Sequence, residues 1–338
     1  MNKSIDYRSD TLTQPTAEMR ECMAQATVGD DVYGEDPSVN QLEQTAAQLL
    51  GKQAGLFVSS GTQGNLLAML GHCQRGDEYI SGDVYHVYLS EARGASVLGG
   101  IASTVLATGD QFEVPVESLR QAIKPDNIHY PISRLLCLEN TVHGRVQSQS
   151  HLQALCDLAH DTGLLTHLDG ARLMNAAIAE GISATEISAP FDSISLCLSK
   201  GLGAPVGSVL CGTNEFIDKA RRNRKLLGGG TRQAGVLAAC GLYALENNIE
   251  RLADDHSNAE RLAKGLASLQ VMPVEQHTNM VFISPPAEHV APMCEHLRGS
   301  GISMTVDTPT MRMVTHLDIS SDDIGKTIGI FKDYFTSL

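Results

Sequence analysis

Short apolar runs alternate along this chain with segments whose apolar residues recur at helical spacing. Runs of this length, bounded by glycine and polar residues, are typical of buried strands. We predict strands at residues 55–60, 135–139, 164–169, 193–199 and 208–212. Helices are predicted to follow from Gly61 through Leu70 and over residues 149–162. Alternating strands and helices predict an α/β fold with a mostly parallel central sheet.

The last third of the chain has a different pattern. Residues 232–269 read as a long helical region with a break near Asn247-Asn248. Two strand-like runs follow at 279–284 and 311–317, with helices near 287–298 and 321–335. This order predicts a small α+β domain. We therefore expect a large domain with an N-terminal arm over 1–250 and a smaller C-terminal domain over 251–338.

Composition narrows the partners and the compartment. Of the 338 residues 42% are apolar and 19% are charged, and the net charge of −14 argues against nucleic acids and anionic membranes as partners. The eight cysteines form no Cys-x-x-Cys pair, which favours reduced thiols and gives no sign of a metal site. Residues 1–6 hold no apolar signal core, and no run is long enough to span a membrane. A cytoplasmic protein that acts on a small molecule is expected.

Asp169 and Lys200 each follow a predicted strand, with a helix-length segment between them. A lysine at such a position can form a Schiff base with pyridoxal phosphate, and an aspartate can keep the pyridinium nitrogen protonated. The plainer interpretations are a helix cap for Asp169 and a structural role for Lys200. Arg172, three residues beyond Asp169, adds a group that can bind a substrate carboxylate in a bidentate fork.

Three further segments could contact such a cofactor. Ser60, Gly61 and Thr62 join a strand to a helix, so their backbone N–H groups could bind a phosphate, although a plain turn fits equally well. His86 could stack on an aromatic ring or exchange protons, or be structural. Arg232 follows three glycines near a helix start, where a surface arginine is the plainer interpretation. The sequence holds no zinc-protease, serine-hydrolase or dinucleotide fingerprint.

Taken in order, these segments resemble the low-specificity L-threonine aldolases, which are pyridoxal-phosphate enzymes with the fold of the aspartate aminotransferase superfamily. The resemblance runs nearly end to end. It is carried by Tyr7-Arg8-Ser9-Asp10-Thr11, Gly29-Asp30-Asp31-Val32-Tyr33-Gly34, Ser60-Gly61-Thr62-Gln63, Leu138-Glu139-Asn140-Thr141, Asp169-Gly170-Ala171-Arg172, Leu198-Ser199-Lys200-Gly201-Leu202-Gly203 and Arg312-Met313-Val314-Thr315-His316. Each motif alone is weak, and their number and order are specific.

The resemblance implies a role for each cofactor-binding residue. Lys200 carries the cofactor, and Asp169 meets the ring nitrogen. His86 stacks on the ring face. Gly61 and Thr62, with Ser60 before them, bind the phosphate.

The same resemblance assigns the substrate side. Ser9, Arg172 and Arg312 are expected to bind the substrate carboxylate, with Arg172 close enough to count among the cofactor contacts as well. Tyr33 and Lys225 are expected to reach the site across a dimer interface.

Arg232 is expected to reach the phosphate from a neighbouring subunit. The family implies a homotetramer built as a dimer of dimers with shared active sites.

One position departs from the family pattern. The family commonly has Glu-Asn-Thr-His-Asn after the strand that ends near Glu139, whereas this chain has Thr141-Val142-His143 after Asn140. That histidine is expected to contact the substrate β-hydroxyl. A shift of one residue reverses the direction of a side chain on an extended segment, so His143 does not replace it automatically.

The resulting hypothesis is retro-aldol cleavage of L-threonine, L-allo-threonine or a related β-hydroxy-α-amino acid to glycine and an aldehyde through an external aldimine. The candidate bases are His86, His143 and a bound water. The alternatives are a β-eliminating lyase, an aldolase for an atypical substrate such as an aryl one, an aminotransferase and a cofactor-binding protein without activity. A nicotinamide dehydrogenase is more distant, because its fingerprint is missing.

Overall fold

A seven-stranded sheet forms the centre of the larger part of the molecule. The structure, a computed structural model, describes residues 4–337. The strand order is β2-β8-β7-β6-β5-β3-β4, and every pairing is parallel except the two that β8 makes. The strands are β2 (Ala54–Val58), β3 (Glu78–Gly82), β4 (Ala102–Leu106), β5 (Ser133–Glu139), β6 (Leu165–Gly170), β7 (Ser193–Cys197) and β8 (Ser208–Gly212). The predicted mostly parallel α/β sheet is confirmed.

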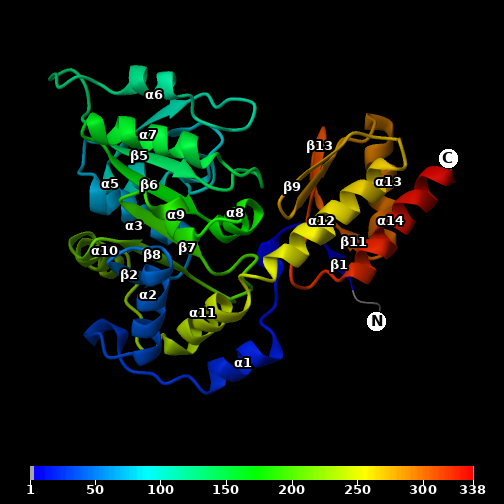
Figure 1. The fold of residues 1–338 in the computed structure, drawn as a ribbon, viewed down its shortest axis with the longest axis horizontal. Helices are drawn as coiled ribbons and strands as arrows, with labels where there is room; N and C mark the ends of the chain where they lie inside the picture. The colour runs from blue at the N-terminus through cyan, green and yellow to red at the C-terminus, as the bar shows by residue number, and fades with distance from the viewer. Residues whose placement is uncertain (1–3, 338) are drawn as a thin grey trace.

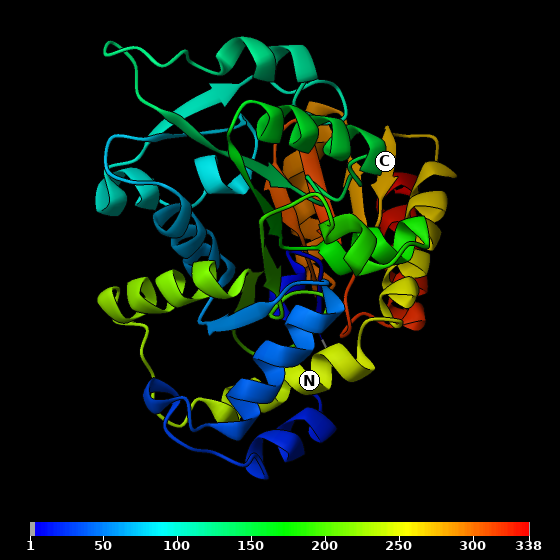
Figure 2. The same ribbon diagram turned by 60° about the vertical axis from the view of Figure 1, so that its left-hand side comes forward.

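Helices cover both faces of this sheet, as Figures 1 and 2 show. Helix α3 packs against β6, β7 and β8, whereas α7 packs against β5 and β6. Helices α2, α11 and α1 stack in turn below the sheet in Figure 1. The helices up to residue 247 are α1 (Ala17–Ala24), α2 (Pro37–Leu49), α3 (Gly61–His72), α4 (His86–Leu89), α5 (Gly94–Gly99), α6 (Val116–Ala122), α7 (Gln149–Asp161), α8 (Leu173–Glu180), α9 (Ala184–Ser188), α10 (Asn214–Leu226) and α11 (Gly235–Asn247).

A second body, at the right of Figure 1, is built on a four-stranded antiparallel sheet in the order β12-β13-β10-β9. The break predicted near residues 247–248 separates α11 from α12. The elements here are α12 (Leu252–Ala267), β9 (Val274–His277), β10 (Met280–Ile283), α13 (Ala287–Gly299), β11 (Ile302–Ser303), β12 (Thr305–Asp307), β13 (Thr310–Val314) and α14 (Ser321–Thr336). The predicted small α+β arrangement is therefore present.

The start of the chain joins this second body. Strand β1 (Ile5–Asp6) pairs in parallel with β11, and Tyr7 is fully buried in the core that α12, α13 and α14 cover. The Tyr7 hydroxyl and Thr327 Oγ1 lie 2.8 Å apart. Two short 3₁₀ helices follow, η1 (Asp10–Leu12) and η2 (Asp31–Tyr33). The N-terminal segment thus runs from the small sheet to the large one, past the place where the two bodies meet.

The sequence pattern missed several elements. Strands β3 and β4 were not predicted, and neither was helix α10, whose exposed face carries many charges. The expectation about residues 1–6 lies partly outside the described residues. Within residues 4–337 no helix is both long and apolar enough to cross a membrane.

Tyr7→Ala tests the docking of the N-terminal segment. We expect it to lower the free energy of unfolding by ~3–5 kcal/mol, because it removes a fully buried aromatic ring and leaves a cavity. Tyr7→Phe keeps the ring and should cost only ~1 kcal/mol for the lost hydrogen bond to Thr327. Urea unfolding measures both values. Equal losses in the two variants would contradict a packing role for the ring.

Candidate active site

The carboxyl ends of the parallel strands gather the chemistry-bearing residues. Asp169 lies near the end of β6, Glu139 ends β5, and Lys200 follows β7 by three residues. His86 begins α4, just after β3. Ligands of open α/β sheets bind at this edge of the sheet. The predicted pairing of Asp169 and Lys200 at neighbouring strand ends is therefore present in the fold.

Asp169 is nearly completely buried, and both of its carboxylate oxygens accept hydrogen bonds. The Asn65 side-chain amide donates to Oδ2 at 2.8 Å, and the Ala171 backbone N–H donates to Oδ1 at 3.0 Å. Neither bond uses all the lone pairs of its oxygen. The carboxylate can therefore still accept a proton-bearing ring nitrogen, which makes its surroundings fit a pyridinium partner.

His86 is held from two sides. Its Nδ1 lies 2.8 Å from Glu91 Oε1, and its backbone N–H donates to Glu139 Oε2 at 2.7 Å. The hydrogen bond to Glu91 raises the pKa of His86, and burial raises the pKa of Glu91. The imidazole is thus fixed in orientation, with Nε2 not used by Glu91.

His86, Glu91 and Asp169 place one ligand atom each within 4.8 Å of one another, which makes them a group that could hold a cation. Each of the three atoms already has a partner, and the Asn65 amide bonds to both carboxylates. The cluster is part of the site just described.

Glu139 is a further carboxyl group of the site, and the sequence analysis gave it no role although it lies inside a quoted motif. Burial and the neighbouring charge of Asp169 raise its pKa. Glu139 and Asp169 are paired in register on β5 and β6, so their side chains lie on the same face of the sheet. The site therefore contains two neighbouring carboxyl groups on one face of the sheet, and the pKa of Glu139 is raised.

Arg172 and Arg312 have very different electrostatic partners. Arg172 forms two hydrogen bonds to Asp10, from Nη2 at 2.6 Å and from Nε at 2.8 Å. Burial alone raises the pKa of Asp10, but Arg172 outweighs this effect and holds the pKa at about 2. Asn279 also donates to Asp10. The charge of Arg172 is consequently balanced within the protein.

Arg312 has no carboxylate partner among residues 4–337. Its Nη2 donates to the Arg8 carbonyl at 3.3 Å, and its buried Nε has no hydrogen-bond partner. Burial and the nearby Arg172 lower its pKa. An incompletely paired guanidinium beside a balanced one is suited to receive an anionic group of a ligand.

The phosphate-site residues form the start of helix α3. Ser60 caps the helix through its Oγ, which accepts the Gln63 N–H at 3.1 Å, and Gly61 is the first helical residue. Thr62 is solvent-exposed on the first turn. The Ser208 Oγ, buried and unpartnered within residues 4–337, lies 3.7 Å from where a Cβ on Gly61 would be. A hydroxyl without a partner beside a helix N-terminus fits a phosphate group.

The chain makes a tight turn after β5, at the position that departs from the family pattern. Val142 and Arg145 exchange two backbone hydrogen bonds, which makes His143 and Gly144 the corner of a tight turn with φ of 48° and 80°. Val142 is fully buried. Burial first, then the charges of Arg312 and Arg172, lower the pKa of His143. His143 is therefore a neutral imidazole near both arginines, and it lies against Phe112 with 5.1 Å between ring centroids.

Ser9 caps the short helix η1, where its Oγ accepts the Thr11 N–H at 3.2 Å. It directly precedes Asp10, and so lies next to the Arg172 ion pair. Within one chain the structure thus gathers Ser9, Arg172 and Arg312 around the meeting point of the two bodies.

Three predicted residues lie elsewhere. Arg232 pairs with Asp30 at 3.2 Å, and Tyr33 is 75% exposed. A Cβ on Gly230 would meet Lys225 Nζ at 3.2 Å. Arg232, Tyr33 and Lys225 therefore share one surface region around η2 and residues 228–232. Within residues 4–337 no hydrogen bond or ion pair joins them to Lys200.

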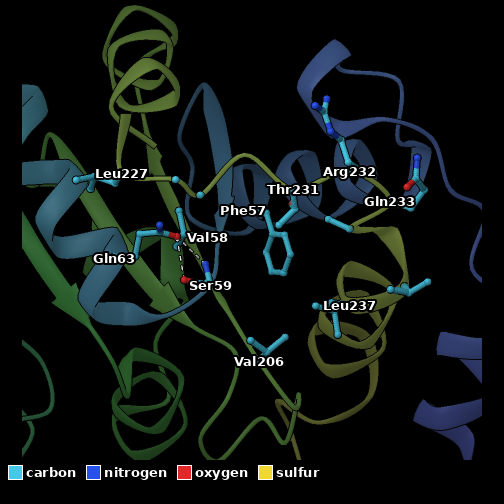
Figure 3. Close-up of a pocket in the computed structure, with 14 residues that line it drawn as sticks. Phe57, Val58, Ser59, Gln63, Val206, Leu227, Thr231, Arg232, Gln233 and Leu237 are labelled. Carbon is cyan, nitrogen blue, oxygen red and sulfur yellow. Dashed lines mark hydrogen bonds between the residues drawn. The ribbon is translucent and has the colours of Figure 1, made fainter. Parts of the chain in front are cut away.

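A cavity of about 490 Å³ lies beside this region, and its lining includes Phe57, Ser59, Gln63 and residues 227–229 and 231–234. Figure 3 shows the guanidinium of Arg232 directed away from Ser59 and Gln63, whose side chains bond to each other.

This fold and this site define a class, the pyridoxal-phosphate-dependent enzymes of fold type I. The model of the beta-eliminating lyase family matches residues 6–287. The low-specificity L-threonine aldolase of Escherichia coli K12 is 45% identical over 95% of this chain and 96% of its own length, and a probable low-specificity L-threonine aldolase 2 of Arabidopsis thaliana is 40% identical over 99% and 98%. The chain belongs to the beta-eliminating lyase family, and within it to the low-specificity L-threonine aldolases.

Solved structures agree on the fold. A threonine aldolase from Leishmania major superposes with a TM-score of 0.84 at 19% identity, covering 98% of this chain and 99% of that one. A serine palmitoyltransferase from Sphingomonas wittichii gives 0.78 at 16% identity, covering 99% and 88%. The predicted aspartate-aminotransferase-like fold is thereby confirmed.

Asp10→Asn tests the charge balance of the arginine site. It leaves Arg172 without its anionic partner, so we expect the free energy of unfolding at neutral pH to fall by ~3 kcal/mol. The folded-state pKa of Asp10 lies below its unfolded value, so its stabilisation is present above about pH 4 and is lost as pH falls toward about 2. Urea unfolding at several pH values should show the difference between wild type and variant narrowing over that window. A constant difference would contradict the ion pair.

Proposed function

We propose that this protein cleaves L-threonine, L-allo-threonine and related β-hydroxy-α-amino acids to glycine and an aldehyde. The observation that carries the proposal is the incompletely paired Arg312 beside the Asp10-balanced Arg172, which lines a small pocket together with Gly170 and Lys200. This arrangement suits an amino-acid carboxylate. The names of the relatives, low-specificity L-threonine aldolases at 40–45% identity, support cleavage by the aldol route.

The residues at the strand ends fit pyridoxal phosphate. Lys200 is proposed to hold it covalently, Asp169 to face the ring nitrogen, His86 to lie against the ring face, and Ser60, Gly61 and Thr62 to bind the phosphate. When bound, the cofactor supplies an electron sink for the charge left at the substrate Cα. The protein contributes the buried anion of Asp169, which favours a protonated ring.

The substrate is oriented by its charged ends. Arg312 and Arg172, with Ser9 nearby, are proposed to bind the carboxylate, and this contact would fix the orientation of the substrate about Cα.

The β-hydroxyl proton needs a base, which a neutral imidazole can provide. His143 fits this role better than His86, because the pKa of His143 is lowered whereas Glu91 raises that of His86. We therefore propose His143 as the base, with His86 or a bound water as the alternatives.

Arg232, Tyr33 and Lys225 are proposed to act across a subunit interface. They lie together on one surface region, where Tyr33 and Leu226 are 75% and 79% exposed. Large exposed apolar side chains on a soluble chain favour burial against a second copy. The proposed assembly is a homotetramer, a dimer of dimers with shared active sites.

The domain division at residue 250 and the compartment are proposals as well. All eight cysteines are free, which supports a reducing, cytoplasmic environment. The proposed large domain covers residues 1–250 and the small one residues 251–338. The two largest apolar clusters support this division, except that Ile5 and Tyr7 belong to the second cluster and Leu252 to the first.

A second candidate function has one observation in its favour. A cavity of about 330 Å³ lies beside His143 and is lined by Phe112 and Phe282. Phe282 and Arg312 are opposite each other on β10 and β13, so both side chains lie on the same face of the small sheet. This cavity is suited to an aryl substituent, as in an aldolase for an aryl β-hydroxy amino acid. A β-eliminating lyase is the other alternative, which the family name suggests.

Product analysis tests the function directly. Cofactor-loaded protein given L-threonine or L-allo-threonine should release glycine and acetaldehyde in equal amounts. A phenyl-substituted β-hydroxy amino acid in a third reaction tests the aryl alternative. Release of ammonia and a keto acid from any of the three, without glycine, would contradict the aldolase and favour β-elimination.

His143→Ala tests the proposed base. We expect kcat to fall at least tenfold and KM to stay within about threefold, because the carboxylate contacts remain. The ratio of rates on L-threonine and L-allo-threonine should also change. Phe112→Leu is the matched control, since it removes the ring that contacts His143 but keeps the imidazole. An unchanged kcat and ratio in His143→Ala would exclude His143 as the base.

A further inference from the structure

Behind Asp169, a line of buried polar side chains runs through the interior of the large sheet. His167 and Asp169 are two residues apart on β6, and Ser193 and Ser195 are two residues apart on β7, so each pair lies on one face of its strand. His167 is opposite Ser193, and Asp169 is opposite Ser195. A Cβ on Gly64 of α3 would lie 2.5 Å from the Ser195 Oγ, so this face of the strands points toward α3. Polar residues on the inner face of a buried sheet need partners.

Asn65 on α3 lies at the centre of this group. Its Nδ2 lies 2.8 Å from both Asp169 Oδ2 and Glu91 Oε1, and its Oδ1 lies 3.1 Å from His167 Nε2. The reverse orientation would place the amide oxygen against two carboxyl groups. The amide is therefore fixed in one orientation, and His167 Nε2 must carry the proton.

This orientation determines the rest of the chain of hydrogen bonds. Burial lowers the pKa of His167 to about 3, so the ring is neutral and its Nδ1 accepts. The Ser193 hydroxyl lies 2.8 Å from that Nδ1 and donates to it. His72 Nε2 lies 2.8 Å from the same hydroxyl and donates in turn. Every donor thus points toward Asp169.

The far end of the chain is fixed by packing. The His72 ring stacks on Phe216 of α10, with 4.2 Å between centroids and 11° between planes. Burial lowers the pKa of His72 to about 4, so it too stays neutral. At the end of the hydrogen-bond chain close to the site, the Asn65 amide donates both to Asp169 and to Glu91, the residue that bonds to His86. One amide therefore connects the proposed partner of the ring nitrogen with the residue proposed to lie on the ring face.

We propose that Asn65 and His167 are positioning residues, which, through the directed chain His72–Ser193–His167–Asn65, keep Asp169 ionised and aimed at the cofactor ring nitrogen. The proposal rests on the proposed role of Asp169. A donor held against a carboxylate oxygen favours its ionised form. Loss of the chain frees the Asn65 amide to turn and removes that donor. A merely structural role for these side chains would affect stability without affecting the cofactor.

His167→Leu and His167→Gln form the decisive pair. Leucine fills the space but cannot donate to Asn65, whereas the glutamine amide can. For His167→Leu we expect the dissociation constant of pyridoxal phosphate to rise at least tenfold. The pH at which the absorbance of the bound cofactor titrates should shift by at least half a unit. For His167→Gln we expect the dissociation constant to lie within about threefold of wild type and the titration pH within about a quarter of a unit of wild type. Ser193→Ala, a milder change, should shift both in the same direction as leucine.

Two controls distinguish a positioning effect on Asp169 from general damage to the fold. His151→Gln changes a half-buried histidine that bonds to the Val114 carbonyl from helix α7, away from the chain, and should leave both readouts unchanged. A deaza cofactor analogue, with C–H in place of the ring nitrogen, cannot use Asp169. With it, wild type and His167→Leu should bind within twofold of each other.

The positioning role would be overturned if His167→Leu bound the cofactor with a dissociation constant within twofold of wild type and its cofactor absorbance titrated within a tenth of a pH unit of wild type. The same tenfold loss with the deaza analogue would also overturn it, because the effect would then not pass through Asp169. Both readouts need no turnover. A wild type that binds cofactor but releases no glycine would refute the proposed function and leave the positioning test intact.

Discussion

The burial of one carboxylate, Asp169, is the constraint on which the rest of the structure depends. A carboxylate inside a sheet is costly unless hydrogen-bond donors surround it. Asn65 and the Ala171 N–H supply them here. To bring Asn65 there, helix α3 must lie close against β7, which only a residue without a side chain at Gly64 permits, since a Cβ would come within 2.5 Å of Ser195. The same helix begins at the proposed phosphate site. The contact of α3 with β7 therefore positions both the proposed phosphate site and the proposed partner of the ring nitrogen.

The balance of charge divides the site into two halves. Asp169 and Glu139 on the large sheet, with Glu91 between α4 and α5, make an acidic wall suited to a protonated ring. Facing it, Arg172 and Arg312 make a basic wall, in which Asp10 neutralises one of the two cations. A zwitterionic amino acid held between these walls meets opposite charge at its carboxylate. The basic wall draws on both bodies of the molecule, because Arg312 belongs to the small sheet whereas Arg172 lies between β6 and α8 of the large body.

Much of the fold and of the candidate site could be predicted from the sequence, and the residues and contacts that could not be predicted have physical reasons. The buried strands before Asp169 and Lys200 are strongly apolar, so their existence and their order could be predicted. Asn65, His167 and Glu91 were missed, because a polar residue carries no local signal in the sequence that names its partner. The alternation of Ser193 and Ser195 was the available hint of a polar inner face. The turn at His143 depends on tertiary contacts, and a contact between subunits, such as the one proposed for Arg232, leaves no trace within one chain.

The most direct test of the account is to locate the covalent link to the cofactor. Protein loaded with pyridoxal phosphate is treated with borohydride, which makes an imine permanent, then digested and analysed by peptide mass spectrometry. The account predicts the added mass on Lys200 alone, and a markedly lower yield of labelled peptide in Asp169→Ala than in wild type at limiting cofactor. Label on another lysine, such as Lys225, or none on Lys200 would contradict it.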